Sequence, residues 1–361
     1  MEINAAVCYE FGKPLAVEEV DLDPPRTGEV RVRVVASSIC HSDVHTIRGD
    51  WGGPLPVVAG HEAAGIVEEI GPDVTLTTPG ERVVVSLLRS CGRCFYCTIG
   101  APHACQGTFA LDRETRLHNK RGEPLVQGIR MAAFAEQIVV DQSQVVALPA
   151  DMPLDCAALL ACGVVTGLGA VVNTARVHTG NSVVVIGTGG VGLNSVQGAR
   201  LAGAHPIIAV DIIDSKLDAA RTFGATHTVN ATRQEPAEAV RALTGGRGAD
   251  YAFVTVGSTE AMSKALTMIG VEGAVVIVGI PHTGATVPLP VRELVFNGQK
   301  VMGSTNGNTR LRVETPRLVE LYQCGRIKLD ELITARYRLD DINTAIEAME
   351  RGQALRNVIM L

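Results

Sequence analysis

The sequence predicts an α/β protein of two domains, the first rich in β-strands and the second built on a doubly wound parallel sheet. Three observations lead to this prediction. The chain has 361 residues, enough for about two hydrophobic cores at roughly 150 residues per domain. The first 150 residues show the period-two alternation of strands. From about residue 164, buried strands alternate with helical segments, which is typical of βαβ units.

Three apolar, β-branched runs support an all-β first domain. Val30–Val35 alternates as V-R-V-R-V-V and predicts a strand with one polar face. Residues 65–70 and 82–88 are further strand candidates, separated by Gly-Pro and Pro-Gly turns. This spacing is typical of a barrel or sandwich. Residues 106–128 are polar and weakly periodic, which predicts a long lobe or loop with a functional or interfacial role.

The second domain is predicted from regular alternation of strand and helix. Strands are expected at 182–186, 207–210, 251–256 and 274–278, and helices at 191–202 and 215–223. Beyond about residue 297 the chain reads as mixed helix and strand.

Charge and cysteine content exclude several classes of protein. The net charge of −6 provides no basic surface for nucleic acid or anionic lipid, so we expect neither as a partner. The sequence contains no run of about 18 apolar residues, so no membrane span is predicted. Nine cysteines are an odd number for disulfides, and the first residues lack the basic and apolar regions of a leader. We therefore expect a cytoplasmic, reducing setting in which cysteines serve as metal ligands, nucleophiles or core residues.

A glycine-rich segment predicts a dinucleotide site. Its glycines are Gly187, Gly189, Gly190 and Gly192. The segment follows a predicted strand and opens a predicted helix, so its backbone can approach a pyrophosphate at the helix N-terminus. Asp211 ends the next strand, where a carboxylate would accept hydrogen bonds from ribose and repel a 2′-phosphate. This favours NAD over NADP; the alternative is an ordinary capping turn with a surface aspartate.

Four cysteines lie within one short segment: Cys91, Cys94, Cys97 and Cys105. Four thiolates satisfy tetrahedral Zn²⁺ and leave no position open, so the prediction is a structural zinc site. An iron–sulfur cluster and a redox Cys-x-x-Cys pair are the alternatives. His103 lies inside the segment and is expected to be solvated.

A second group is dispersed along the chain and consists of Cys40, His61 and Cys162. Three protein ligands plus a water are the pattern of a catalytic zinc. Three separated residues do not establish a site by themselves, because buried cysteine and histidine often only fill a core.

Taken together, the motifs resemble those of the zinc-dependent medium-chain alcohol dehydrogenases, over essentially the full length. The motifs are Cys40-His-Ser-Asp43, Gly60-His61-Glu62, the four-cysteine segment, Ala161-Cys162-Gly163-Val-Val-Thr166-Gly167 and the glycine-rich segment with Asp211. The resemblance implies a GroES-like distorted β-barrel catalytic domain with both zinc sites over 1–163. It also implies an NAD-binding Rossmann domain over 164–304 and a segment, 305–361, that returns to the catalytic domain.

The resemblance also implies roles for individual residues. The catalytic zinc would be held by Cys40, His61 and Cys162, with Glu62 as a transient ligand. Asp43 would lie behind the zinc-bound histidine and fix its tautomer. Ser42 would bind the substrate oxygen and pass its proton on, and His45 would relay it to solvent.

Further positions are implied around the cofactor and the substrate. The cofactor contacts would be His41, Thr166, Val191, Lys216 and Arg356, in addition to the glycines and Asp211. Trp51 and Leu87 would line the substrate pocket, where the tryptophan narrows the channel and favours primary alcohols. Cys8, Cys156 and Cys324 match no ligand role and are assigned to packing.

The implied activity is oxidation of primary aliphatic, allylic or benzylic alcohols to aldehydes with hydride transfer to NAD⁺, and the reverse reduction. Two zinc ions per chain, one catalytic and one structural, are expected. The alternative enzyme is a thiol-adduct formaldehyde dehydrogenase of the mycothiol or glutathione type; the glutathione branch usually lacks histidine at the position of His45. A non-enzymatic cofactor-binding role is a further alternative, but every catalytic ligand is present. The 106–128 lobe resembles that of dimeric members, so a homodimer is expected, with a tetramer as the alternative.

Overall fold

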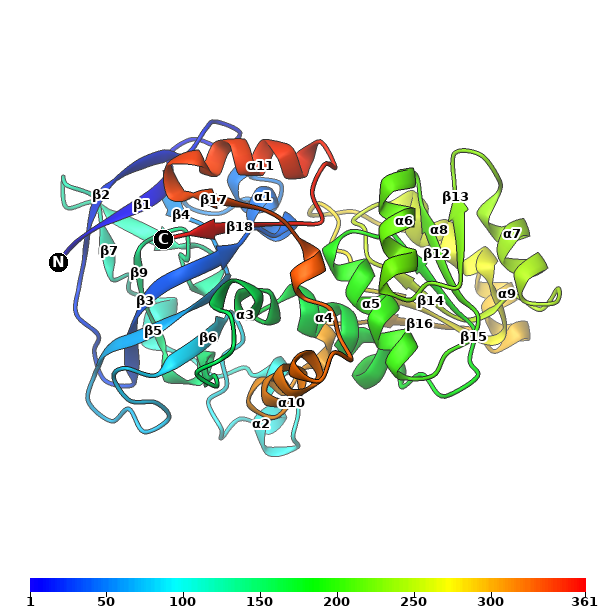
Figure 1. The fold of residues 1–361 in the computed structure, drawn as a ribbon, viewed down its shortest axis with the longest axis horizontal. Coiled ribbons are helices and arrows are strands. Elements are labelled where there is room, and N and C mark those ends of the chain that lie inside the picture. Colours follow the sequence, from blue (N-terminus) through cyan, green and yellow to red (C-terminus); the bar gives the residue numbers. More distant parts are fainter. The chain divides into compact units, whose positions relative to one another are not determined.

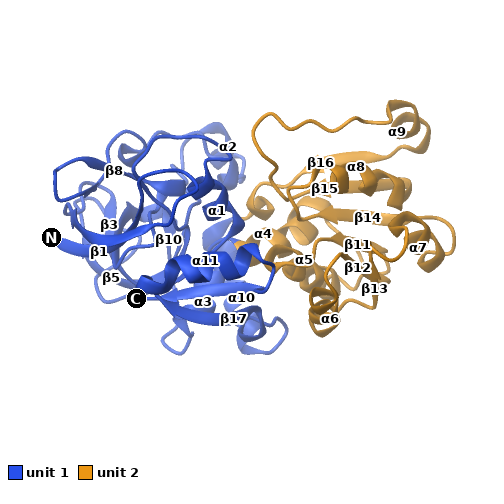
Figure 2. Cartoon of the chain, turned by 90° about the horizontal axis from the view of Figure 1, so that it is seen from above, with its two compact units in different colours: residues 1–162, 310–361 blue, residues 163–309 orange.

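The computed structural model describes all residues, 1–361, and divides them into two compact units (Figure 2). Unit 1 consists of residues 1–162 together with 310–361, and unit 2 consists of residues 163–309. The last part of the chain therefore belongs with the first part.

Unit 1 contains a closed barrel of short and medium strands in the order β1-β2-β7-β8-β4. These are β1 (Glu2–Cys8), β2 (Ala16–Leu22), β4 (Val57–Val58), β7 (Leu117–His118) and β8 (Pro124–Gln127). Alanine, valine and leucine side chains such as Val20, Leu22 and Leu125 fill its core. The barrel confirms the predicted β-rich first domain.

The same unit contains a seven-stranded sheet in the order β10-β6-β5-β3-β18-β17, with β9 also paired to β3. Its strands are β3 (Glu29–Ser38), β5 (Glu62–Ile70), β6 (Arg82–Ser86), β9 (Gln137–Asp141), β10 (Val145–Ala147), β17 (Ile333–Arg338) and β18 (Arg356–Met360). The pairing of β18 with β3, with Val358 opposite Ser38, brings the C-terminal segment into this sheet (Figure 1).

Helix α1 departs from the all-β prediction for this region. The helices of unit 1 are α1 (His41–Arg48), α2 (Phe95–Thr98), α3 (Leu154–Leu160), α10 (Leu311–Gln323) and α11 (Ile342–Glu350). Val44 and Ile47 of α1 are three residues apart and both buried, so they form one apolar helical face. Gly49 ends the helix in the left-handed conformation.

The prediction of an irregular lobe over 106–128 is only partly correct. Strands β7 and β8 lie within it, pair with each other, and join β2 to β4 so that the barrel closes. These strands have two and four residues. Strands this short leave no period-two pattern to recognise.

Unit 2 confirms the predicted doubly wound sheet. Its six parallel strands run in the order β13-β12-β11-β14-β15-β16. They are β11 (Val183–Ile186), β12 (Ile207–Asp211), β13 (His227–Asn230), β14 (Ala249–Val254), β15 (Ile269–Ile277) and β16 (Lys300–Gly303). This is the strand order of dinucleotide-binding folds, which bind ligand beyond the carboxyl ends of the central strands.

Helices cover both faces of this sheet. They are α4 (Gly163–Gly169), α5 (Gly190–Leu201), α6 (Asp214–Phe223), α7 (Pro236–Leu243), α8 (Thr259–Met268) and α9 (Val291–Asn297). Helices α7 and α8 pack against the face that carries Val184, Ile208 and Ala252. Right-handed connections place α5 and α6, which contact each other, on the opposite face.

No single helix is long and apolar enough to cross a membrane; only the bent pair formed by residues 154–160 and 163–175 meets the length and composition test.

Candidate active site and metal centres

Four potential metal ligands from three separate segments of unit 1 converge on one point. The ligand atoms of Cys40, His61, Glu62 and Cys162 all lie within 4.8 Å of one another, and all four residues are buried. Cys40 directly precedes α1, His61 and Glu62 stand at the start of β5, and Cys162 follows α3. The structure thus brings together the three dispersed residues that the sequence singled out, and Glu62 with them.

The backbone before His61 is shaped by a glycine and by a buried carboxylate. Gly60 has a φ of +95°, and a Cβ there would lie 2.5 Å from the backbone nitrogen of Phe134, so only glycine fits. Asp43 Oδ1 accepts a hydrogen bond from the Gly60 nitrogen at 3.0 Å, and Oδ2 accepts one from the Cys40 nitrogen at 3.0 Å. Asp43 therefore fixes the Cys40 and His61 segments relative to each other.

Asp43 also orients the histidine ring. His61 Nδ1 lies 2.7 Å from Asp43 Oδ1, and both side chains are fully buried. The other ring nitrogen, Nε2, is buried and has no hydrogen-bonding partner. Such a nitrogen is costly in a protein interior unless it binds something. Two thiols, an imidazole and a carboxylate are a donor set that suits zinc, and a carboxylate behind the imidazole is its usual support.

The two thiols of the cluster act as a pair. Cys162 beside Cys40 lowers the pKa of the Cys40 thiol well below its ordinary value. The thiolate is the form that binds zinc. Cys162 is held in place through its neighbour Ala161, whose carbonyl accepts a 2.6 Å hydrogen bond from Ser86 Oγ.

Arg356 lies against this cluster. Its Nη1 donates to Glu62 Oε1 at 3.1 Å and to the Ile39 carbonyl at 3.2 Å. Burial raises the pKa of Glu62 to about 7, against the opposing influence of the Arg356 charge. Arg356, expected from the resemblance to contact the cofactor pyrophosphate, is only 4% exposed and serves here as the counter-ion of Glu62.

Helix α1 carries Ser42 and His45 three residues apart, and therefore on one side. His45 Nδ1 lies 2.7 Å from Asp50 Oδ2. The His45 ring also packs against Trp51, with 5.0 Å between the ring centroids. Trp51 thus contacts the expected relay residue, and Asp50 is a partner that no motif predicts.

Two more expected site residues of unit 1 can be placed. His41 is the exposed first residue of α1. Leu87 follows β6, is half-buried, and packs against the core of the seven-stranded sheet.

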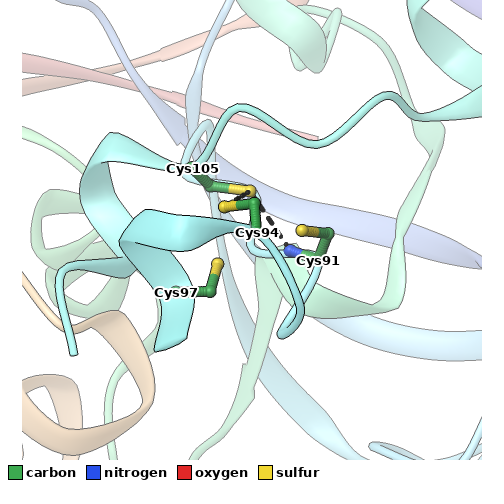
Figure 3. A group of neighbouring side chains, drawn as sticks. All are labelled: Cys91, Cys94, Cys97 and Cys105. Carbon is green, nitrogen blue, oxygen red and sulfur yellow. Dashed lines mark hydrogen bonds between the residues drawn. The ribbon is translucent and has the colours of Figure 1, made fainter. Parts of the chain in front are cut away.

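The second cluster lies in the loop around α2 (Figure 3). The sulfur atoms of its members lie within 4.8 Å of one another, and the members are Cys91, Cys94, Cys97 and Cys105. Cys105 Sγ accepts hydrogen bonds from the backbone nitrogens of Cys91 at 3.2 Å and Gly107 at 3.3 Å. Backbone hydrogen bonds at residues 97 and 106 lower the pKa of Cys94 to about 6. Amide donors that favour thiolate sulfur, and four sulfurs with no other ligand type, fit a closed zinc site.

His103 stands in this loop but outside the cluster. Its Nδ1 is buried without a hydrogen-bonding partner, and burial lowers the pKa of the ring. The expectation that this histidine is solvated is therefore wrong for its Nδ1 atom.

The glycine-rich segment connects β11 to α5 in unit 2, as predicted. Gly189 caps α5 and Gly190 is its first residue. A Cβ on Gly192 would lie 1.8 Å from the Gly187 carbonyl oxygen, so the turn closes only with glycine there. Asp211 ends β12, the strand beside β11, so the carboxylate stands next to the glycine-rich turn.

Four donors of the protein hold the Asp211 carboxylate. Oδ2 accepts from the backbone nitrogen of Thr188 at 2.7 Å and from its hydroxyl at 2.9 Å. Oδ1 accepts from the backbone nitrogens of Ile212 at 2.7 Å and Ile213 at 3.1 Å. The contact with the Thr188 side chain was not predictable from the motif, in which this position is unrestricted.

The remaining expected cofactor residues of unit 2 lie on three helices. Thr166 is buried on α4, Val191 is partly exposed in the first turn of α5, and Lys216 is half-buried near the start of α6. Helices α4 and α5 approach closely, because Gly167 lies against the Val191 carbonyl.

The three cysteines assigned to packing differ from one another. Cys8 and Cys156 are buried, whereas Cys324 is exposed at the end of α10. The packing assignment is therefore wrong for Cys324, which is exposed directly after the last residue of α10.

Comparison with known proteins identifies two family matches. Residues 26–150 match the alcohol dehydrogenase GroES-like domain, and residues 190–323 match the zinc-binding dehydrogenase family.

Individual relatives match along the whole chain. An NDMA-dependent alcohol dehydrogenase of Amycolatopsis methanolica is 38% identical, covering 100% of this chain and 99% of its own. An S-(hydroxymethyl)glutathione dehydrogenase of Saccharomyces cerevisiae is 39% identical over 98% of this chain and 95% of its own. Among solved structures, the benzyl alcohol dehydrogenase of Acinetobacter calcoaceticus has a TM-score of 0.93 at 33% identity, covering 100% of this chain and 99% of its own.

Proposed function

Because the chain belongs to the zinc-dependent alcohol dehydrogenase family, we propose that it oxidises primary alcohols to aldehydes with hydride transfer to NAD⁺, and that it also catalyses the reverse reduction. Membership of this family makes the chain an oxidoreductase that uses zinc and a nicotinamide cofactor. The observation that carries the proposal is the buried Cys40–His61–Glu62–Cys162 cluster with its unpartnered His61 Nε2.

In this proposal Cys40, His61 and Cys162 hold the catalytic zinc. When bound there, zinc supplies a Lewis acid that lowers the pKa of a substrate hydroxyl. Asp43 keeps the ring of His61 in the orientation that presents Nε2. Glu62 is a transient fourth ligand, and its pairing with Arg356 holds it back from permanent binding.

The proton of the alcohol passes along α1. Ser42 receives it at its hydroxyl oxygen and gives up its own hydroxyl proton, which His45, three residues further along the helix, delivers to water. The partial exposure of His45 and its contacts with Asp50 and Trp51 support this role, since they hold the ring at a surface where protons exchange.

The second zinc, on the four-cysteine loop, is structural. Its ligand set leaves no position open for substrate. The cysteine ligands of both sites must stay reduced to bind metal, so we propose that the protein works in the cytoplasm.

The cofactor binds at the glycine-rich turn of unit 2, with Asp211 toward the adenosine ribose. Thr166, Val191 and Lys216 are the further contacts proposed within this unit. The position of the turn at the N-terminus of α5, beside the carboxyl end of β12, supports this binding mode.

The substrates proposed are primary aliphatic, allylic or benzylic alcohols, with Trp51 and Leu87 in the pocket wall. The structural likeness to a benzyl alcohol dehydrogenase supports the benzylic class. The second candidate is oxidation of a thiol adduct of formaldehyde, which is favoured by the relative named S-(hydroxymethyl)glutathione dehydrogenase.

A substrate panel separates the two candidates. The zinc-loaded protein with NAD⁺ is assayed with butanol, crotyl alcohol and benzyl alcohol, and with formaldehyde in the presence or absence of glutathione or mycothiol. We expect turnover of the alcohols without a thiol. Oxidation of formaldehyde only with an added thiol, and no turnover of the alcohols, would support the second candidate instead.

We also propose that the protein is a homodimer. Helix α9 has no buried residue, and its Val295 and Phe296 are 74% and 75% exposed. Next to it in sequence, β16 is the edge strand of the six-stranded sheet and exposes Val301. An apolar face beside an unpaired strand edge requires a cover, and a second copy related by a twofold axis offers an identical face and edge.

Light scattering after size exclusion tests the assembly. The wild type is expected at twice the chain mass, and Val295→Glu with Phe296→Glu at one chain mass. Phe95→Glu, which changes a similarly exposed residue on α2, is the matched control and should remain dimeric. A wild-type monomer contradicts the proposal, and a mass of four chains identifies the tetramer.

A further inference from the structure

We propose that the Thr188 hydroxyl competes with the adenosine ribose for the carboxylate of Asp211, and so weakens cofactor binding and the preference for NADH over NADPH. The inference rests on the proposed binding of NAD at the glycine-rich turn. It concerns a residue inside that turn for which neither the motif nor the expected cofactor contacts assign a role.

The hydrogen-bonding capacity of Asp211 is fully used by the protein itself. A carboxylate has about four acceptor positions on its two oxygens. The backbone nitrogen and hydroxyl of Thr188 occupy two on Oδ2, at 2.7 and 2.9 Å. The backbone nitrogens of Ile212 and Ile213 occupy two on Oδ1, at 2.7 and 3.1 Å.

Only one of these four donors can leave without rebuilding the turn. Three are backbone amides, whose directions are fixed by the strand end and the glycine-rich turn. The fourth is a side-chain hydroxyl, which can rotate about a single bond. Thr188 is fully buried while Asp211 is partly exposed, so the hydroxyl approaches from the protein side and the solvent side stays open to a ligand.

A ribose hydroxyl that donates to Asp211 must therefore share Oδ2 with the Thr188 hydroxyl or displace it. Either course reduces the net gain from the new hydrogen bond, because one existing charge-assisted bond is weakened or lost. The same hydroxyl partly neutralises the carboxylate, so it also reduces the repulsion felt by the 2′-phosphate of NADPH. Both effects act in one direction and lower selectivity for NADH.

Thr188→Val tests the proposal, because valine keeps the shape of threonine and removes only the donor. Dissociation constants for NADH and NADPH are measured by titration calorimetry on the zinc-loaded protein. We expect NADH to bind about two- to tenfold more tightly, as for the recovery of one net hydrogen bond. The ratio of the NADPH constant to the NADH constant should rise as well.

Two further variants make the test specific. Thr188→Ser retains the hydroxyl and should bind NADH as the wild type does. In an Asp211→Ala background the Thr188→Val substitution should have no effect on NADH binding, because no carboxylate remains to compete for. If Thr188 had only a structural role, the Thr188→Val substitution would lower NADH affinity by the same factor in both backgrounds.

Unchanged or weaker NADH binding by a folded Thr188→Val protein, with Thr188→Ser normal, overturns the inference and leaves the proposed function intact. Absence of NADH binding by the wild type contradicts the proposed function itself, so the two failures are distinguishable.

Discussion

Asp43 acts on three parts of the proposed zinc centre at once. Its two oxygens accept from the backbone nitrogens of Cys40 and Gly60 and lie against His61 Nδ1. Because the residue is fully buried, its removal leaves these groups without an acceptor in the protein interior.

We therefore predict that Asp43→Ala lowers zinc affinity of the catalytic site about 10- to 100-fold. Competition with a chelator, followed by metal analysis, measures this loss. Asp50→Asn is the matched control, since it changes an exposed carboxylate that also pairs with a histidine, and its zinc affinity should equal that of the wild type. If Asp43→Ala bound zinc as tightly as the wild type, His61 would not need the Asp43 carboxylate to bind the metal.

The free thiols differ in reactivity. Cys324 is exposed, whereas burial raises the pKa of Cys156 to about 12 and raises that of Cys8 as well. The thiolate is the reactive form, so at pH 8 almost none of Cys156 can react. We predict one rapidly modified thiol per zinc-loaded chain with Ellman's reagent at pH 8. Cys324→Ser should abolish the rapid phase and Cys156→Ser should leave it unchanged; the reverse pattern would contradict the burial of Cys156.

Functional residues could be predicted from the sequence where they lie in a short local motif. Their hydrogen-bonding partners from distant parts of the chain could not. Asp43 lies three residues from Cys40, and its relation to the zinc site follows from the short motif. The partners Thr188 of Asp211 and Arg356 of Glu62 depend on which strands lie side by side. Arg356 lies 294 residues from Glu62, and only the return of β18 into the sheet brings them together.

At the scale of elements, hydrophobic periodicity predicted long helices and strands better than short ones. The glycine-rich turn, its strand and helix α5 are predicted nearly residue for residue, because four glycines at fixed spacing and the apolar repeat of a 12-residue helix reinforce each other. Strands β7 and β8 are missed because two to four residues carry no repeat. Helix α1 is missed because polar and charged side chains fill all of its positions except Val44 and Ile47.

The four-cysteine loop is an element whose order depends on its metal. It holds only the short helix α2 and isolated turns, and α2 has no buried residue. With so little apolar burial, the zinc–thiolate bonds must supply the folding energy of the loop. We predict that Cys94→Ser loses one zinc and lowers the melting temperature by several degrees.

Scanning calorimetry with metal analysis measures both effects. Cys324→Ser, which removes an exposed cysteine outside the loop, is the control and should melt as the wild type does. A Cys94→Ser protein with normal zinc content and melting temperature would contradict a structural role for this site.

At the scale of the whole molecule, the two halves of the proposed chemistry belong to separate compact units. Both metal clusters lie entirely within residues 1–162, and the glycine-rich turn with Asp211 lies within residues 163–309. The change of pattern near residue 164 could be read from sequence because two different periodicities meet there. The resemblance implied that the last segment returns to the first domain, but the pairing of β18 with β3 could not be read, since a five-residue strand carries no information about its neighbour.

This separation predicts that metal loss and cofactor loss can be uncoupled. The wild type should contain two zinc ions per chain, one for each cluster. Cys40→Ala should contain one zinc and show no alcohol oxidation, yet keep its fold and bind NADH, because every residue of the glycine-rich turn lies in the other unit. Asp211→Gly should show the converse, with two zinc ions and a reduced preference for NADH over NADPH.

Metal analysis, calorimetry and titration with NADH and NADPH on the same preparations check the predictions for the wild type and both variants. One zinc in the wild type would eliminate one of the two sites, and loss of NADH binding in Cys40→Ala would show that the cofactor site depends on the metal cluster.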